Sequence, residues 1–142
     1  MEFTKSRAYR TTDNALVEGK NGAVVRKHIG YGPIAAEHAA ALQSFYTAHL
    51  NPYLNYHRPC GYATLRTLAR GRQRRIYRPA DYHTPFEKLT SLPNWQQYLK
   101  PGITAELLHR RAARLSDTEA ARQMQNAKIA LLAQCRSNRG KP

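Results

Sequence analysis

Residues 116–135 read SDTEAARQMQNAKIALLAQC and form the best-supported helix in the sequence. Ser116 and Glu119 have the spacing of a capping box, in which each side chain accepts a hydrogen bond from the other residue's backbone N–H. The apolar residues available for packing are Met124, Ala127, Ile129, Leu131 and Leu132. The stretch therefore predicts a long helix from Ser116 to about Cys135.

A second helix, rich in alanine, is predicted over residues 35–56. Its larger side chains recur at helical spacing and are expected to face a core. These side chains are Leu42, Phe45, Tyr46, His49 and Leu50. Pro52 lacks a backbone N–H and should bend or stop this helix, which would leave residues 53–59 as a final turn and exit.

Three shorter helical segments are predicted in the second half of the chain. Thr84-Pro85 favours a helix through Leu89, because proline suits the first helical position. Residues 93–99 form another short piece, and residues 104–115 form an amphipathic helix. We interpret the helices within 104–135 as core or as an oligomer seam rather than as membrane-binding, because their basic residues do not bracket a strong apolar stripe.

Residues 62–78 predict a β-hairpin, because two β-favouring runs flank a turn that contains Gly71. Six arginines lie in this hairpin, and no acidic residue occurs between Glu37 and Asp81. The six are Arg66, Arg70, Arg72, Arg74, Arg75 and Arg78. Guanidinium groups pair with phosphates and release counterions, so we interpret the hairpin as a DNA contact. The alternative is a hairpin whose charges are simply solvated.

The overall charge of the chain also favours a nucleic-acid partner. The chain has 142 residues, with 23 Lys and Arg against nine Asp and Glu, which gives a formal charge of +14. Such an excess favours a polyanionic partner, with nucleic acid first and an anionic membrane surface second. No apolar run approaches the roughly 20 residues of a transmembrane helix, and the first residues do not resemble a signal peptide.

The remaining chemically active side chains form no site pattern. Cys60 and Cys135 are far apart and predict neither a disulfide framework nor a zinc site, so a cytoplasmic protein with reduced thiols is expected. The six histidines are scattered without metal-ligand spacing. Four tyrosines could stack on bases, although packing against the helices is the preferred interpretation. They are Tyr53, Tyr56, Tyr62 and Tyr77.

The first helix is predicted over residues 14–29, with Asp13 as its N-cap and residues 30–33 as its end. Glu18 lies one turn into this helix. On a helical wheel, Asn21 and Arg26 lie within about 80° of Glu18, whereas Lys20 and Lys27 lie nearly opposite. Without further information, Glu18 would be interpreted as a surface acid that pairs with a nearby Lys or Arg.

Residues 3–21 and the ending Val-Arg-Lys-His-Ile-Gly-Tyr at 25–31 resemble the last part of the catalytic core of bacterial insertion-sequence transposases with an integrase core. The likeness continues more loosely to Pro59. It implies a ribonuclease-H-like fold with an Asp-Asp-Glu triad that holds two divalent ions, Mg²⁺ or Mn²⁺. In that family the ions activate water or a DNA 3′-hydroxyl for attack on a phosphodiester.

Glu18 matches the third acid of that triad and is the candidate catalytic and metal-binding residue. No residue of this sequence matches the two aspartates, and Asp13 matches a capping position. One carboxylate cannot hold two divalent ions, so the chain alone is expected to bind none and to be inactive. The DNA-binding candidates are Lys20, Asn21, Arg26, Lys27 and the six hairpin arginines.

The sequence thus predicts a mainly α fold with a small β-hairpin. Residues 1–59 are interpreted as the end of an integrase catalytic core, and residues 60–142 as a basic hairpin with a helical extension. The leading functional hypothesis is a truncated transposase fragment that binds DNA, with intact transposase or self-association as further partners. The alternatives are a stand-alone nucleic-acid-binding regulator of transposition and a non-functional remnant that folds poorly.

Overall fold

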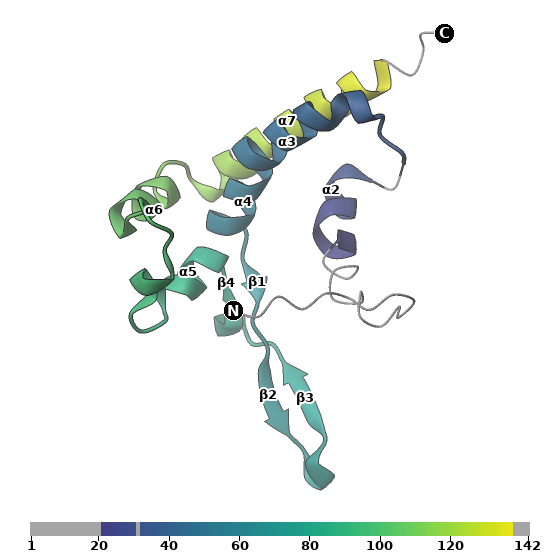
Figure 1. Cartoon of the computed structure of the whole chain (residues 1–142). Helices are drawn as coiled ribbons and strands as arrows, with labels where there is room; N and C mark the ends of the chain where they lie inside the picture. The colour runs from purple at the N-terminus through teal and green to yellow at the C-terminus, as the bar shows by residue number, and fades with distance from the viewer. Residues whose placement is uncertain (1–20, 31, 138–142) are drawn as a thin grey trace.

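A computed structural model describes residues 21–30 and 32–137 of the chain. They are mainly helical with two small antiparallel sheets (Figure 1). The α-helices are α2 (Lys27–Ile29), α3 (Ala39–Phe45), α4 (Asn51–Tyr56), α5 (Pro85–Thr90), α6 (Ala105–Ala112) and α7 (Asp117–Ser137). The strands are β1 (Cys60–Gly61), β2 (Thr64–Thr67), β3 (Gln73–Ile76) and β4 (Tyr82–His83). The prediction of a mainly α chain with a hairpin is confirmed.

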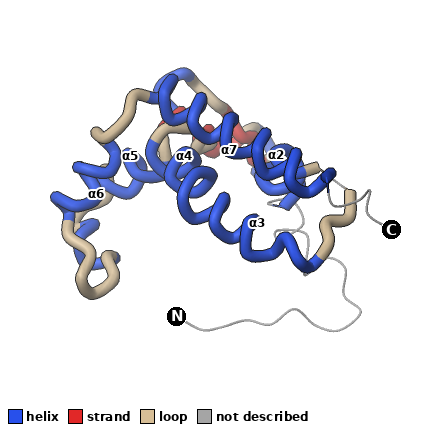
Figure 2. The backbone as a smooth tube through the Cα atoms, turned by 90° about the horizontal axis from the view of Figure 1, so that it is seen from above, coloured by secondary structure: helices blue, strands red, loops and turns tan. Residues whose placement is uncertain are grey.

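The core lies between α7 and the helical segment that contains α3 and α4. This segment runs from Ala36 to Tyr56, and α7 packs along it in the opposite direction (Figures 1 and 2). The buried side chains between them are Phe45, Leu50, Met124, Leu131 and Cys135. Leu50 is only 2% exposed, as expected for a residue on the predicted core face. This antiparallel pair, called the helical pair below, is the body of the fold.

The second helix reaches Tyr56, as predicted, and Pro52 does not stop it. The chain remains helical to Tyr56, with Pro52 near the start of α4. A π-helical turn, Tyr46–Leu50, immediately precedes it. A proline ring collides with the carbonyl four residues earlier in a regular α-helix, and the wider π-helical turn moves that carbonyl away. The helix therefore continues and places Tyr53 and Tyr56 beside α7.

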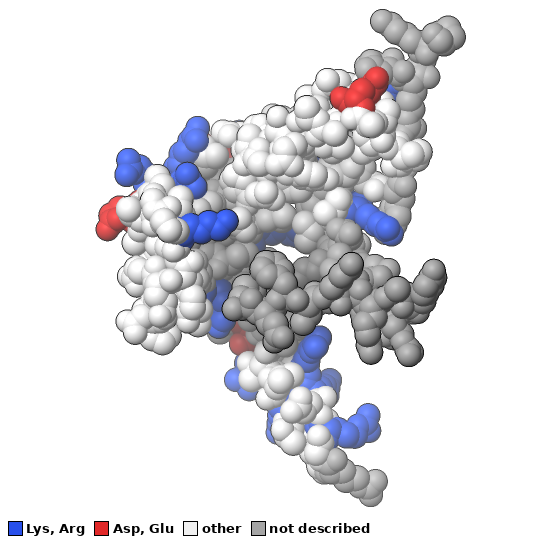
Figure 3. All heavy atoms as spheres, in the orientation of Figure 1, with Lys and Arg blue, Asp and Glu red and all other residues white. Residues whose placement is uncertain are grey.

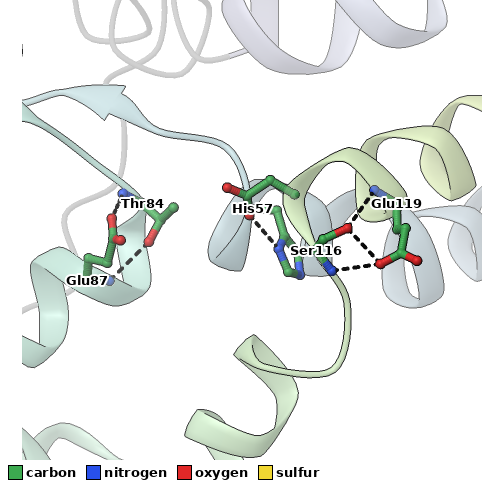
Figure 4. A network of polar contacts seen from close by, with 6 residues as sticks. His57, Thr84, Glu87, Ser116 and Glu119 are labelled. Atoms are coloured by element: carbon green, nitrogen blue, oxygen red, sulfur yellow. Dashed lines mark hydrogen bonds and ion pairs between the residues drawn. The ribbon is translucent and has the colours of Figure 1, made fainter.

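The capping box at the start of α7 forms as predicted. The Glu119 backbone N–H donates to Ser116 Oγ at 3.3 Å, and the Ser116 N–H donates to Glu119 Oε2 at 3.0 Å (Figure 4). Ile129 was expected to pack, but it is 57% exposed. It lies about 140° around the helix from Met124, whereas Leu131 and Cys135 lie within about 20°.

A smaller aromatic cluster joins α4 to α5 and α6. The Phe86 ring lies 5.3 Å from Tyr56 and 5.1 Å from His109, measured between ring centroids. Trp95, in a 3-10 turn at Trp95–Tyr98, packs against Phe86 at 6.4 Å and is 8% exposed. Tyr56 therefore packs against this cluster, as preferred in the sequence analysis, whereas Tyr77 is 50% exposed.

A second capping box begins α5. Thr84 Oγ1 accepts from the Glu87 N–H at 3.1 Å, and Glu87 Oε2 accepts from the Thr84 N–H at 2.7 Å (Figure 4). The predicted start at Thr84-Pro85 is confirmed. Thr104 likewise caps α6 by accepting from the Leu107 N–H at 3.2 Å. These local bonds fix where the helices around the aromatic cluster begin.

The described part of the first predicted helix is also helical. A π-helical turn, Asn21–Arg26, leads into α2, which packs against α7. The helix ends at Gly30, whose φ of +94° favours glycine. Asp13, Glu18 and Lys20 lie outside the described residues, as does Tyr31.

Candidate nucleic-acid interface

The β2–β3 hairpin projects away from the helical pair as a separate ribbon (Figure 1). Every residue of β2 is exposed, and in β3 only Ile76 is half-buried. Gly71 in the connecting turn has a φ of +74°, and the Leu68 N–H donates to the Arg72 carbonyl at 2.7 Å to close the ribbon. The predicted hairpin is confirmed, and its side chains have little to pack against.

The register places arginines on both faces of the ribbon. Arg66 lies directly opposite Arg74, whereas Arg75 pairs with Leu65 and points to the other face. Facing residues of an antiparallel pair have Cα atoms about 4.5–5.5 Å apart, and like charges at such positions are destabilising. The Arg66–Arg74 pair therefore costs folding energy unless an anion lies between the two.

Few carboxylates are available to neutralise this charge. Asp81, which follows the hairpin, accepts from the Arg78 backbone N–H at 2.6 Å and from Thr64 Oγ1 at 3.4 Å. Across the described ranges, the five hairpin arginines whose side chains are described form no ion pair. They are Arg66, Arg72, Arg74, Arg75 and Arg78, all exposed. Figure 3 shows basic side chains along this projection.

The base of the hairpin is clasped by the second sheet. β1 pairs with β4, so that Cys60 lies opposite His83 and Gly61 opposite Tyr82. A Cβ at Gly61 would lie 2.8 Å from the Tyr77 ring, so a larger residue here would require that ring to shift. The sequence did not predict this sheet, because each of its strands has only two residues.

Tyr62 lies beside the clasp and is held by its neighbours. The Lys88 ammonium lies 5.4 Å from the Tyr62 ring centroid. Burial first, and then a hydrogen bond with Cys60, raise the pKa of Tyr62 to about 12. The phenol therefore stays neutral at physiological pH and supports the ribbon as a packing group.

The other predicted DNA contacts are not part of this ribbon. Arg26 and Lys27 are exposed on the segment that packs against α7. The side chain of Asn21 lies outside the described residues, and so do Glu18 and Lys20 in full. The structure therefore places six of the ten predicted DNA-binding residues on the hairpin, five of them with described side chains, since Arg70 lies in its turn but its side chain is not described.

Within residues 21–30 and 32–137, no three His, Cys, Asp or Glu side chains are grouped as metal ligands. None of the helices described there combines the length and apolar character needed to cross a bilayer.

A cavity between α4, α6 and α7 was not predicted from the sequence. Arg111 and Arg114, at the end of α6, line it together with Tyr53 and Tyr56. In the sequence these arginines belonged only to the polar side of an amphipathic helix. Their spacing of three residues places them on one face, but only the tertiary fold shows what that face meets.

Comparison with known proteins gives one partial relative. No family model matches the sequence, and no solved structure is detectably similar. A stretch of 47 residues is 55% identical to the uncharacterized protein y4rM of Sinorhizobium fredii. The match covers 32% of this chain and 13% of that protein, which is therefore more than twice as long as this chain.

Proposed function

We propose that this chain binds DNA through the β2–β3 hairpin and is the C-terminal part of an integrase-core transposase. Two independent observations support the proposal. The sequence of residues 3–31 resembles the end of that catalytic core, and the hairpin exposes arginines with no paired carboxylate among the described residues. The second observation carries the DNA-binding part of the proposal.

Phosphate is the anion that fits the hairpin best. Arg66 and Arg74 face each other across the strands, so a phosphate bound between them would relieve their mutual repulsion. Guanidinium groups bind phosphate oxygens through short, charge-assisted hydrogen bonds. Such contacts neutralise phosphates, release counterions and make the affinity depend steeply on salt.

The shape of the element also suits duplex DNA. The major groove admits a two-stranded β-ribbon, and here the ribbon carries arginines on both faces. A ribbon in a groove lies between two phosphate backbones, which these arginines would contact. Contacts of this kind position a protein on DNA without reading its sequence.

Glu18 is the one residue that we assign to the catalytic chemistry of the family. Its proposed partners are two aspartates that match no residue of this sequence. Hard divalent cations need several converging carboxylates, so we expect no metal-dependent DNA nicking by these 142 residues alone. Nicking by the purified chain that Glu18→Gln abolished would overturn this expectation.

A stand-alone regulator is the second candidate function. The hairpin projects from the helical pair and is not built from the segment that contains Glu18 (Figure 1). DNA binding by the ribbon alone would let the chain compete with an intact transposase for DNA. This candidate predicts that Glu18→Gln leaves the DNA affinity unchanged and that the chain inhibits strand transfer by the complete enzyme.

The proposed DNA contact is tested with a matched pair of triple variants. One carries Arg72→Gln, Arg74→Gln and Arg75→Gln, and the control carries Lys100→Gln, Arg110→Gln and Arg136→Gln. All six residues are exposed, so both variants lose three positive charges with little effect on folding. Affinity for a duplex is measured by fluorescence anisotropy between 50 and 200 mM salt, the range over which phosphate contacts weaken most visibly.

The hairpin variant should weaken binding and reduce the slope of log affinity against log salt by about 2 to 3, since each phosphate contact contributes about 0.9. The control should change the slope by less than one such contact. Equal effects of the two variants would mean that only net charge matters, and the hairpin assignment would then be wrong.

A further inference from the structure

A cavity of about 570 Å³ opens between the helical pair and the end of α6. Its volume lies within the range of about 300–1,000 Å³ that is typical of small-molecule sites. The lining comes from three parts of the chain that are distant in sequence: the segment 47–57, the segment 111–115 and the first turns of α7. The polar members of the lining are Thr47, His49, His57, Arg111, Arg114 and Gln123.

The cavity has an apolar floor and aromatic walls. Leu115, Ala120 and Met124 line it, and the last two are 5% exposed each. Tyr53 and Tyr56 contribute from α4. The Tyr56 ring is held by Phe86 at 5.3 Å, so the wall it forms is fixed by the aromatic cluster. A flat apolar group could lie between this wall and the floor.

The mouth of the cavity is basic. Arg111 and Arg114 are exposed, and no carboxylate of the described residues is among the lining side chains. Asp117 is the nearby acid, and its Oδ1 lies 3.0 Å from Nδ1 of the buried His57 (Figure 4). This bond links the end of α4 to the start of α7. The site therefore offers two free guanidinium groups above an apolar, aromatic pocket.

We propose that this cavity binds a nucleotide, with the base against Tyr53 and Tyr56 and the phosphate between Arg111 and Arg114. Aromatic side chains stack on any base, and paired arginines bind phosphate oxygens. The proposal goes beyond the DNA contact of the hairpin, because it concerns a different part of the chain and a single nucleotide rather than a duplex. The nucleotide is either a free mononucleotide or an unpaired residue of a strand, and the two sources are separated below.

Isothermal titration of the whole chain with adenosine 5′-monophosphate tests the site. Adenosine and inorganic phosphate serve as the two half-ligands. We expect the nucleotide to bind at least tenfold more tightly than either half. Phosphate that bound as tightly as the nucleotide would overturn the proposal, because the aromatic walls would then contribute nothing.

Two kinds of variant localise the binding. Arg111→Gln with Arg114→Gln should weaken nucleotide binding at least tenfold, whereas the control, Arg110→Gln with Arg136→Gln, should change it by less than twofold. Ala48→Trp places a large ring at an exposed point of the lining and should also weaken binding at least tenfold. Unchanged affinity in both the double variant and Ala48→Trp, with native circular dichroism, would refute the site.

Further titrations distinguish a free mononucleotide from an unpaired residue of a strand. If a single-stranded hexanucleotide binds more tightly than the mononucleotide, and the double variant abolishes this gain in affinity, the natural ligand is a residue of a nucleic-acid strand. If the mononucleotide binds and the hexanucleotide binds no more tightly, the natural ligand is a free mononucleotide.

The hairpin triple variant should change the affinity for the nucleotide by less than twofold. The hairpin proposal and the cavity proposal can therefore be refuted independently. A hexaglutamate peptide that competed as tightly as the nucleotide would overturn the assignment in favour of an acidic peptide.

Discussion

Leu50 and Leu65 lie in the two contrasting regions of this molecule. Leu50, in the helical pair, is 2% exposed and contacts the core formed with Met124 and Leu131. Leu65, in the β2–β3 hairpin, is 58% exposed and faces Arg75 across the ribbon. The first region is stabilised by burial of apolar area, and the second is a two-stranded ribbon with almost no burial of its own.

The difference shows which residues serve the fold and which are available for binding. A two-stranded ribbon without a buried face is marginally stable in water, and like charges placed across it make it less so. The arginines of the hairpin therefore do not contribute to folding, whereas the apolar residues of the helical pair do. Substitutions in the two regions should accordingly affect different measurements.

The largest effect is expected from Leu50→Ala in the helical pair. Removing a fully buried leucine side chain costs about 2–5 kcal/mol of the free energy of unfolding, because transfer energy is lost and a cavity remains. Urea denaturation followed by circular dichroism measures the change. Leu65→Ala is the matched control and should stay within about 0.5 kcal/mol, as exposed substitutions do. Equal losses in the two variants would contradict the division into two regions.

An intermediate effect is expected from Ser116→Ala at the start of α7. Loss of the N-cap oxygen leaves the Glu119 N–H without its partner and should destabilise the protein by about 1 kcal/mol. The helical pair should weaken while DNA affinity at temperatures well below unfolding stays unchanged. A fall in affinity with no fall in stability would show that α7 itself contacts DNA.

The same capping box gives a pH dependence with a defined sign. Hydrogen bonds from the Ser116 side chain and backbone lower the pKa of Glu119 below its ordinary value. The stability that Glu119 contributes is therefore present above pH 4.5 and is lost as the pH falls through its lowered pKa. The difference in stability between the protein and Ser116→Ala should narrow in that acidic range, and a difference that widened there would contradict the assignment.

The smallest effect on stability, with the opposite sign, is expected from Arg66→Glu in the hairpin. A glutamate opposite Arg74 replaces repulsion with attraction and should leave stability unchanged or raise it by about 0.2–1 kcal/mol. Duplex affinity should fall at the same time, because a phosphate contact is lost. Thermal melting measures the change in stability, and fluorescence anisotropy on the same sample measures the change in duplex affinity. Arg66→Gln is the control for charge loss without the new pair, and a gain of affinity in Arg66→Glu would exclude the ribbon as the DNA contact.

Much of the fold could be predicted, because its boundaries are set by local bonds. The capping box of Ser116 with Glu119, the helix start at Thr84-Pro85 and the helix end at Gly30 each depend on neighbouring residues, and the structure bears out all three. The hairpin was predictable for a similar reason, since its turn at Gly71 and its β-favouring strands are adjacent in sequence. The helix around Pro52 ends at Tyr56 as predicted, but the sequence does not reveal the π-helical turn that precedes the proline.

Contacts between distant residues could not be read from the sequence. The β1–β4 clasp pairs Cys60 with His83 through strands too short to carry a periodic signal. The cavity arises only because α6 ends where α4 and α7 meet, which brings Arg114 near Tyr56. The hairpin arginines were the exception among the site residues, since their density along one short segment was visible without any tertiary contact. Glu18 remains a prediction that depends on the resemblance to the transposase family.

The clasp at the base of the hairpin has a consequence for how this protein can change over time. The chain leaves the helical body at Cys60 and returns at His83, directly opposite, with the Tyr62 N–H donating to the Asp81 carbonyl at 2.8 Å just inside. The residues between Cys60 and His83 therefore form a unit whose two ends are held together by the β1–β4 pairing. Insertions, deletions or charge changes in the ribbon can therefore accumulate without moving a helix, so the proposed binding surface can change while the scaffold stays constant.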